Sequence, residues 1–551
     1  MLNAAARYFH TLRHLKARQI VARARFRLQR PAVPSAEPLA RAAGGEGWVV
    51  PPGREPVLTG PWRVRLLGRE REIGAPSSWQ DADPERLWLY NLHYFDDLNA
   101  REAPARSAWQ RAWIARWPAE NPPVSGVGWE PYPVSLRAVN WIKWVLAGNA
   151  ATSAMLASLA QQLRHLSRRV EWHLLGNHLL ANAKTLVFGG AFFGGAEADV
   201  WLAQGAEILE AELAEQVLSD GGHFERSPIY HALALEDALD LVNLLRAYPR
   251  RAFVRRAALE AALRDAAPRM QAWLEAMCHP DGGIAYFNDC AFGVALEADA
   301  LRGYGAALGL MAALAAPGSL DLAASGYARL KAGDWCAIFD AAPVGPDYLP
   351  GHAHADTLTF ELSLGAERVV SNSGTSTYEV GRQRSFERST RAHATVEIDG
   401  EDSSEVWSSF RVARRARPLE RSFERTGAGV RAACAHDGYT RLRGAPVHRR
   451  EVEVAVGGIA WADRVEGTGR HRVRGRLPLH PGVRASLAGS RAILSTGSGA
   501  RLELRADGVA ALELEGGTYA PCFGRVEPRQ VIAWTIDAPL PVEARFTLRR
   551  A

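Results

Sequence analysis

The sequence predicts an α+β protein of several domains, with a helical part followed by an antiparallel β-rich part. Its 551 residues exceed what one compact core usually serves. From about residue 105 to 316, apolar residues recur at helical spacing, whereas after about 320 short alternating segments are divided by turn residues. We therefore expect a basic N-terminal helix and extension over 1–85, a helical domain over 86–320 and a β domain over 321–551.

Within the helical domain, four segments place apolar residues at helical spacing: 134–150, 154–175, 201–218 and 230–248. Glycine-rich stretches at 188–195 and 219–224 are expected to separate helices. Successive amphipathic helices with short connections pack naturally as antiparallel pairs. The sequence therefore favours a run of helix pairs.

The C-terminal part changes to short, β-branched or alternating segments. Strands are expected within 334–342, 357–365, 368–374, 393–400, 448–458, 459–467 and 491–499, and in the final RFTLRR. This pattern is typical of many antiparallel strands in stacked sheets.

The N-terminal segment is strongly basic, with eight Lys or Arg between Arg7 and Arg30 and no acid before Glu37. One interpretation is an exposed helix that packs on the domain through Tyr8, Phe9, Leu12, Leu15, Ile20 and Phe26, and this is the one we expect. The alternative is an amphipathic helix that touches anionic lipid or a partner. The segment has no apolar core typical of a secretory signal, so the cytoplasm is the default location, with the periplasm and secretion left open.

Composition excludes several classes of function. The net charge of +6 suits an acidic polysaccharide without selecting one. No apolar run reaches the ~20 residues of a transmembrane helix, and five cysteines without a CxxC pair argue against a disulfide framework or a cysteine zinc site. Phosphate-binding glycine motifs are absent, and the arginine-rich run 411–425 has no stacking aromatic except Phe423, so we expect no nucleic-acid partner.

Three polar clusters are candidates for chemistry. The first is Asn177 and His178 in an apolar stretch, and the second is DGGHFERSPIY with Tyr230 at the start of a helix. In the third, PGHAHADTLTFEL, an extended backbone would place His352, His354 and Asp356 on one face. Helix packing, capping and surface polarity are the structural alternatives. His393 would complete a metal site if its strand lies alongside.

The succession GNH, DGGHFERSPIY, GHAHADTLTFEL and STRAHATVEIDG resembles the heparinase II/III family, which includes heparin/heparan sulfate lyases and some alginate lyases. NLHYFDDL, WEPYPVSLRAVNW, HPDGGIAYFNDC and HDGYTRLRGAPVHRR match the same pattern, so the resemblance covers about residues 85 to 490. It implies an incomplete (α/α) toroid of helix pairs, then an antiparallel β-sandwich, with an acidic glycan bound in the cleft between them. It also implies cleavage by β-elimination beside a uronate.

β-Elimination needs neutralisation of the uronate carboxylate, a base for the C5 proton and an acid for the leaving oxygen. The resemblance assigns neutralisation to Asn177 and His178. It makes Tyr230 the acid and, for one substrate stereochemistry, also the base. For the other stereochemistry, His352 is the base. Tyr378 lies near the position of a second catalytic tyrosine in some members.

The resemblance also implies a structural zinc site at His354, Asn372 and His393, although the chemistry itself requires no cofactor. Family members commonly have Asp where this chain has Asn372, which removes a negative charge from the site. Asp356 would either substitute as a ligand or orient a neighbouring imidazole. By motif, the expected substrate-binding residues, with capping and salt bridging as alternative roles, are Arg137, Asn140, Glu225, Arg226, Asn288, Asp289 and Arg388.

Three functions compete. The first is a polysaccharide lyase, linked to bacterial exopolysaccharide or capsule metabolism. The second is a glycoside hydrolase on the same fold, which needs two facing carboxylates, such as Glu225 with Asp289 or Asp356. The third is a non-catalytic glycan-binding protein of polysaccharide biosynthesis. The retained Asn177, His178, Tyr230 and His352 favour the lyase.

Overall fold

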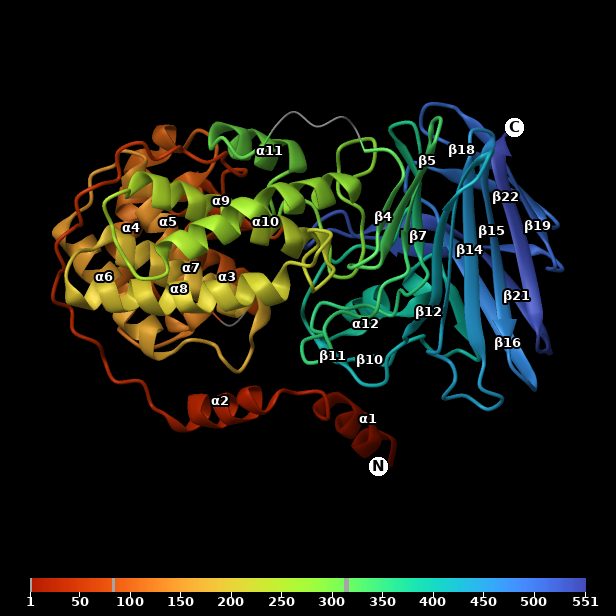
Figure 1. Ribbon diagram of the computed structural model, residues 1–551, viewed down its shortest axis with the longest axis horizontal. Coiled ribbons are helices and arrows are strands. Elements are labelled where there is room, and N and C mark those ends of the chain that lie inside the picture. The colour runs from red at the N-terminus through yellow and green to blue at the C-terminus, as the bar shows by residue number, and fades with distance from the viewer. Residues whose placement is uncertain (1, 82–84, 312–316) are drawn as a thin grey trace.

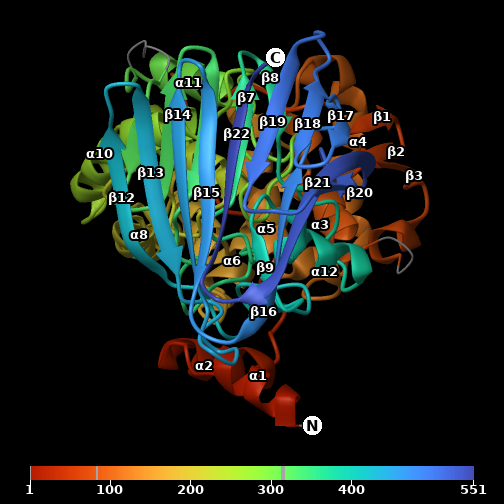
Figure 2. The ribbon, with the colours of Figure 1, turned by 90° about the vertical axis from the view of Figure 1, so that its right-hand side faces the viewer.

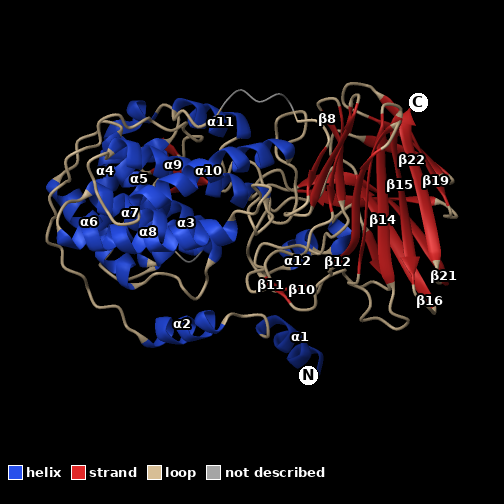
Figure 3. Cartoon of the chain, viewed as in Figure 1, coloured by secondary structure: helices blue, strands red, loops and turns tan. Residues whose placement is uncertain are grey.

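A computed structural model describes residues 2–81, 85–311 and 317–551, and in it a helical part precedes a β-rich part (Figure 1). Figure 3 shows the two parts side by side. The helices of the first part are α3 (Arg86–Tyr94), α4 (Ser107–Glu120), α5 (Pro131–Leu146), α6 (Ser153–Arg168), α7 (Gly176–Phe192), α8 (Ala196–Gln216), α9 (Pro228–Ala247), α10 (Arg256–Ala276) and α11 (Ala298–Ala307).

These helices contact one another in two rows. In one row α3, α5, α7, α9 and α11 touch in succession, and in the other α4, α6, α8 and α10 do so. Helices adjacent in sequence, such as α7 and α8 or α9 and α10, pack across the rows. The apolar residues at helical spacing form one continuous core between the rows.

The glycine-rich stretch 188–195 does not separate helices as expected, because α7 continues through it to Phe192. A Cβ atom at Gly190 would lie 2.6 Å from the Ala198 carbonyl oxygen, and one at Gly205 would lie 2.7 Å from that of Ala183. These glycines therefore allow α7 and α8 to approach closely. The break comes at Gly195, whose φ of 95° precedes α8.

The β-rich part contains three main antiparallel sheets. The eight-stranded sheet has the order β12 (Pro418–Arg425), β13 (Gly429–His436), β14 (Val447–Ala455), β15 (Gly458–Glu466), β22 (Val542–Arg550), β19 (Arg501–Asp507), β18 (Arg491–Ser495) and β17 (Arg484–Ala488). The five-stranded sheet runs β4 (Leu320–Leu322), β5 (Tyr327–Ala332), β6 (Trp335–Asp340), β7 (Phe360–Leu364) and β8 (Glu367–Val370). The four-stranded sheet runs β20 (Leu512–Tyr519), β21 (Glu527–Pro539), β16 (Arg470–Pro478) and β9 (Val396–Ile398).

The sheets bury their apolar faces against one another. Along β14 buried and more exposed residues alternate, and Val452 and Val454 point into the core. β5 contacts β13 and β14, so the five-stranded sheet packs on the eight-stranded sheet, and Figure 2 shows β7 and β8 behind it near β22 and β19. The strands expected from the sequence are present, within a few residues at their ends.

Part of the expected N-terminal extension belongs to the helical core. The small sheet of β1 (Leu58–Gly60), β2 (Arg63–Leu66) and β3 (Arg69–Glu72) packs there with Trp48 and Trp79. The preceding helices α1 (Leu2–Leu12) and α2 (Ala17–Leu28) instead form an arm along the outside of the molecule (Figure 1).

The arm packs differently from the expectation. The Tyr8 ring lies 4.9 Å from that of Trp407, on the hairpin of β10 (Val406–Trp407) and β11 (Arg411–Val412). The Phe26 ring lies 4.2 Å from that of His173 in the helical part. Phe9, Leu12 and Ile20 were all expected to pack inward, but they are exposed. The arm thus crosses between the two parts. None of the described helices is long and apolar enough to cross a membrane.

Candidate active site

His352 brings residues of both parts together. Its ring centroid lies 3.7 Å from that of Tyr230, with the rings nearly stacked. Its Nδ1 atom lies 3.0 Å from Asp289 Oδ2, and its Nε2 atom lies 3.6 Å from Glu225 Oε2. The segment that carries His352 is a loop and not the expected extended strand entry. The candidate residues nevertheless converge there.

Tyr230 is positioned by the first turn of α9. Ser227 caps this helix, because its side-chain oxygen accepts the backbone N–H of Tyr230. The Tyr230 hydroxyl lies 2.9 Å from that of Tyr378. Burial raises the pKa of both phenols well above the ordinary value. The Asp289 carboxylate adds to both shifts, and Tyr378 adds to that of Tyr230. Tyr230 therefore holds its proton at neutral pH and can donate it.

Asp289 is buried and fixes the histidine loop. One oxygen lies 2.9 Å from His354 Nε2, the other bonds His352, and the Arg384 guanidinium binds both, at 2.8 Å for Oδ2. Burial opposes ionisation, but Arg384 and the imidazoles outweigh it and hold the pKa of Asp289 well below its ordinary value. The anionic carboxylate makes Nδ1 of His352 a donor, which leaves its Nε2 free to accept a proton.

Asn177 and His178 lie in the first turn of α7, where the helix dipole favours a bound anion. His178 Nδ1 lies 3.2 Å from Glu171 Oε2, and its ring lies 4.4 Å from that of Tyr132. Burial lowers the pKa of His178, but the carboxylates of Glu171 and Glu225 raise it more, so the net shift is upward. His178 is therefore suited to carry positive charge beside a carboxylate.

Asn177 links this turn to the histidine loop. Its backbone N–H donates to Glu225 Oε1 at 3.1 Å, and Glu225 Oε2 faces His352. Among the described residues, the Asn177 side-chain amide has no hydrogen-bond partner. It remains available to a ligand.

A buried cluster beside this site can hold a metal. One ligand atom each from His354, Asp356 and His393 lies within 4.8 Å of the others. His393 donates its Nδ1 proton to the Ser389 carbonyl at 2.8 Å, so its Nε2 is an acceptor. Burial lowers the pKa of His354 to about 4, and its single proton belongs on the nitrogen that faces Asp289.

As a result, His354 Nδ1 and His393 Nε2 face each other as lone pairs at 3.2 Å. Two opposed lone pairs next to a carboxylate suit a divalent cation, and a ligating histidine commonly donates its other N–H to a carboxylate. The residues present therefore fit a zinc-type ion. The third candidate ligand in this cluster is Asp356, one of the two alternatives expected from the sequence, and not Asn372.

Asn372 is engaged elsewhere. Its side-chain oxygen accepts from Thr359 Oγ1 at 2.9 Å, and its amide donates to the Tyr286 carbonyl at 2.7 Å. These two hydrogen bonds connect the segment after β8 to Thr359, just before β7, and to the loop that carries Tyr286. The assignment of Asn372 as a metal ligand is therefore replaced by a structural role.

Three arginines expected to bind substrate are buried and donate hydrogen bonds to backbone carbonyls. Arg137 donates to the His93 and Gly128 carbonyls and covers the Trp117 ring. The other two behave alike: Arg226 donates to the carbonyls of Phe224 and Ser325, and Arg388 donates to that of Ala353 beside His352. These guanidinium groups therefore position the backbone around the site, which replaces the expected substrate contact.

The remaining residues expected to bind substrate differ in their surroundings. Asn140 donates to the Tyr94 carbonyl and to Asp96, so its amide is satisfied internally. Asn288 accepts the backbone N–H of His354 and therefore supports the histidine loop. Asp289 is fully buried and acts through the histidines. Of this group, only Glu225 directs a carboxylate oxygen with no hydrogen-bond partner toward His352.

Sequence reasoning missed Glu171 and Tyr132, the partners of His178. The periodicity predicts a helix over 154–175 that includes Glu171, but α6 ends at Arg168 and the following turn brings Glu171 to His178. Tyr132 lies in WEPYPVSLRAVNW, which was recognised without a role for this residue. No local spacing connects either one to His178.

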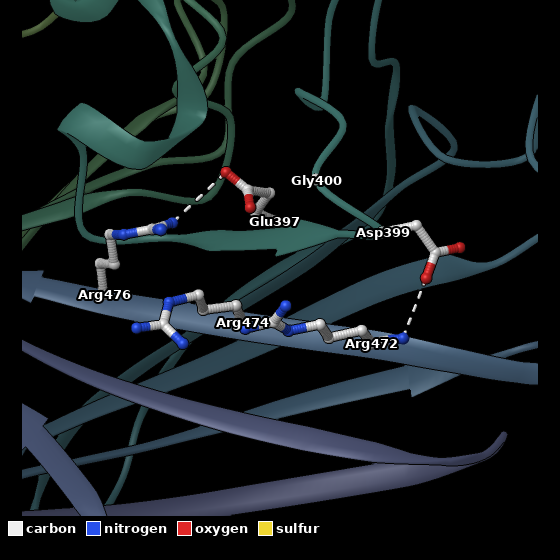
Figure 4. A pocket seen from close by; sticks show the side chains of 6 residues that line it. All are labelled: Glu397, Asp399, Gly400, Arg472, Arg474 and Arg476. Atoms are coloured by element: carbon white, nitrogen blue, oxygen red, sulfur yellow. Dashed lines mark hydrogen bonds and ion pairs between the residues drawn. The ribbon is translucent and has the colours of Figure 1, made fainter.

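A hollow of about 450 Å³ lies on the β-rich part, between β9 and β16 (Figure 4). Arg472, Arg474 and Arg476 line one side, and Glu397 and Asp399 line the other. The arginines are largely paired: Arg476 contacts Glu397, and Arg474 contacts Glu513 and Glu515. This charge balance gives no defined anion site.

Comparisons with known proteins agree with this arrangement. Residues 94–297 match the family described as heparinase II/III N-terminus, and residues 315–545 match heparinase II/III-like, C-terminal. A heparin-sulfate lyase of Pedobacter heparinus is 24% identical over 370 residues, or 59% of this chain and 53% of that protein. The chain thus spans about half or less of the length of the heparin-sulfate lyases it matches.

Two further relatives cover more of the chain. The FtsZ-localized protein C of Caulobacter vibrioides is 25% identical over 477 residues, which cover 80% of this chain and 77% of that protein. The crystal structure of heparinase III superposes with a TM-score of 0.69 at 18% identity, covering 88% of this chain and 80% of that one. The structural likeness supports a shared fold.

Proposed function

This chain belongs to the heparinase II/III-like family, and on that premise we propose that it is a polysaccharide lyase that cleaves a uronic-acid-containing glycan by β-elimination. The observation that carries the proposal is the stacked pair of His352 and Tyr230, with a proton acceptor and a proton donor side by side. The two rows of helices would form the incomplete toroid, and the stacked sheets the sandwich, with glycan between them.

The proposed step uses residues of both parts. His178, with Asn177, neutralises the uronate carboxylate, which makes the C5 proton more acidic. His352 Nε2 takes that proton, the C5–H electrons form the C4=C5 double bond, and the C4–O bond breaks. The Tyr230 hydroxyl protonates the leaving oxygen, which balances the step. The raised pKa of Tyr230 favours this division over one in which Tyr230 is also the base.

The charges around the site favour a substrate of low sulfate density. Arg137, Arg226 and Arg388 are committed to backbone carbonyls, and Arg384 is committed to Asp289. Sulfate groups are bound most strongly by cations that are not already paired within the protein. We therefore propose a carboxylated and sparsely sulfated glycan, as in a bacterial exopolysaccharide or capsule.

The metal cluster would have a supporting role. His354, Asp356 and His393 would hold the ion, and the ion would supply positive charge and rigidity to the loop of His352. The chain's own residues perform the proton transfers.

Hydrolysis is less well supported by the geometry. It needs one carboxyl group free to protonate the leaving group and another free to act on water or sugar. Glu225 meets the first need, but both oxygens of Asp289 are bound by Arg384 and imidazoles, and Asp356 lies in the buried histidine cluster.

The test is the ultraviolet absorbance of an unsaturated uronyl product, measured with purified protein over a panel of acidic glycans of different sulfation. Tyr230→Phe should abolish the signal, and Tyr248→Phe, at the opposite end of the same helix α9, should retain it. Reducing ends that appear without absorbance would support hydrolysis. Glycan binding with neither product would support the non-catalytic role and exclude the lyase.

A further inference from the structure

The N-terminal arm leaves an apolar stripe exposed. The inner face of α2 is set by Gln19, which is buried, and by Phe26, which packs on His173. At 3.6 residues per turn, the opposite face carries an unbroken series of exposed apolar side chains: Ala17, Ile20, Val21, Ala24 and Leu28. Leu28 is 82% exposed and Val21 is 68% exposed. Monomeric proteins rarely leave such a contiguous stripe without a use.

The preceding helix repeats the pattern. In α1 the Tyr8 side packs on Trp407, while Phe9 and Leu12, three positions apart, are exposed. Figures 1 and 2 show α1 and α2 along the same outer side of the molecule. Both helices therefore lie on one side of the molecule, and each leaves apolar side chains exposed to solvent.

Arginines flank this stripe. On α2, Arg18 and Arg25 lie along one edge and Arg27 along the other. Among the described residues, no carboxylate forms an ion pair with Arg7, Arg13, Arg25, Arg27 or Arg30. No acidic residue precedes Glu37. Arg18 pairs with Glu212 and Glu215, so among the described residues the unpaired cations beside the stripe of α2 are Arg25 on one edge and Arg27 on the other.

From these observations we propose that the arm docks the protein on an anionic lipid surface, with α1 and α2 lying in the plane of the interface. The apolar stripe would enter the boundary between headgroups and acyl chains, and the flanking arginines would contact the anionic headgroups. A protein partner would require acids that match both edges, whereas a lipid surface supplies negative charge on both sides of the stripe.

The inner contacts hold the stripe in this orientation. Lys16 pairs with Glu215 and lies over the Tyr348 ring, at the loop that leads to His352. Arg169 covers the inner-facing Phe26 ring. The arm is therefore attached to both parts of the molecule while its outer face stays free, and docking requires no unfolding of the body.

The test is sedimentation of the full chain with vesicles of phosphatidylglycerol and phosphatidylcholine, compared with pure phosphatidylcholine. We expect binding to the anionic vesicles only, weakened by salt. The double variant Val21→Asp with Leu28→Asp should lower the partition coefficient by about tenfold or more. The matched control is Val254→Asp with Val456→Asp, two exposed valines elsewhere, and should bind like the wild type.

A second variant separates charge from apolar insertion. Arg25→Gln with Arg27→Gln should weaken binding roughly tenfold at low salt and reduce its salt dependence. Failure of the wild type to sediment with anionic vesicles overturns the proposal, as does equal binding by the Val21/Leu28 variant. Light scattering without lipid gives a further check, because self-association that depends on Val21 and Leu28 would assign the stripe to a second copy instead. Thermal melting of each variant verifies folding.

Discussion

The ring of His352 stacks on the ring of Tyr230, with 3.7 Å between centroids and 27° between planes. His352 comes from the loop before β7 and Tyr230 from the first turn of α9, so the contact joins the two parts of the molecule. It places a nitrogen with a free lone pair next to a phenol that keeps its proton. A glycan bound against this pair would meet its base and its acid together.

Loss of the imidazole should remove the base without removing the binding site. We expect His352→Gln to lower kcat by about 10²- to 10⁴-fold, with a small change in KM. The control is His480→Gln, because His480 lies in the β-rich part against Tyr519 and outside the site. An equal loss in the control, or a His352→Gln enzyme with normal kcat, would remove His352 from the mechanism.

Asp289 should matter for both stability and activity. Asp289→Asn leaves the buried Arg384 guanidinium without its counter-charge, which should lower the free energy of unfolding by about 3 to 5 kcal/mol. It also releases Nδ1 of His352, so activity should fall. Adding Arg384→Met should recover much of the stability in chemical denaturation. Recovery of activity along with stability would contradict an orienting role for Asp289.

The alkaline limb of the pH profile should report His178. Its pKa is raised above the ordinary 6.5, so the imidazolium that neutralises substrate is lost only as pH rises through that raised value. Glu171→Gln removes the nearest carboxylate and should move the falling limb of kcat/KM to lower pH. The control Glu260→Gln, in an exposed pair with Arg264, should leave the limb in place. A limb unmoved by Glu171→Gln would exclude His178 as its source.

The same shift predicts how stability changes with pH. A group whose folded pKa is raised contributes stability fully below its unfolded pKa and loses it as pH rises through the folded value. The melting temperature of wild type relative to His178→Asn should therefore fall as pH rises above about 6.5. A difference that grows with pH would contradict the upward shift.

The sequence predicts the order of helical and β-rich parts because periodicity of apolar residues is local information. It also selects Asn177, His178, Tyr230 and His352 as candidates, since each lies in a recognisable motif. Their mutual geometry depends on residues that no motif connects. Glu171 reaches His178 through the turn after α6, and Arg384 reaches Asp289 from 95 residues away.

The errors have a common physical cause. Arg137, Arg226 and Arg388 have the charge that a glycan site needs, but charge alone does not distinguish a ligand contact from a buried guanidinium on backbone carbonyls. Gly189 and Gly190 have the composition of a helix break, yet helix packing requires small residues there. Phe9 and Ile20 have the composition of core residues, but the arm turns them outward.

The candidate metal cluster contains Asp356 and not Asn372, and this difference can be tested directly. We expect the purified protein to retain a divalent cation measurable by elemental mass spectrometry. Asp356→Asn, which keeps the side-chain volume, should lower metal content severalfold because it removes the only carboxylate of the described cluster. Asn372→Ala should lower the melting temperature by loss of two hydrogen bonds and leave metal content unchanged. Because burial raises the pKa of the free Asp356 carboxyl to about 6, protons compete with the cation for this group, and metal content should fall as the pH is lowered. Metal lost from Asn372→Ala and kept by Asp356→Asn would restore the assignment first made from the sequence.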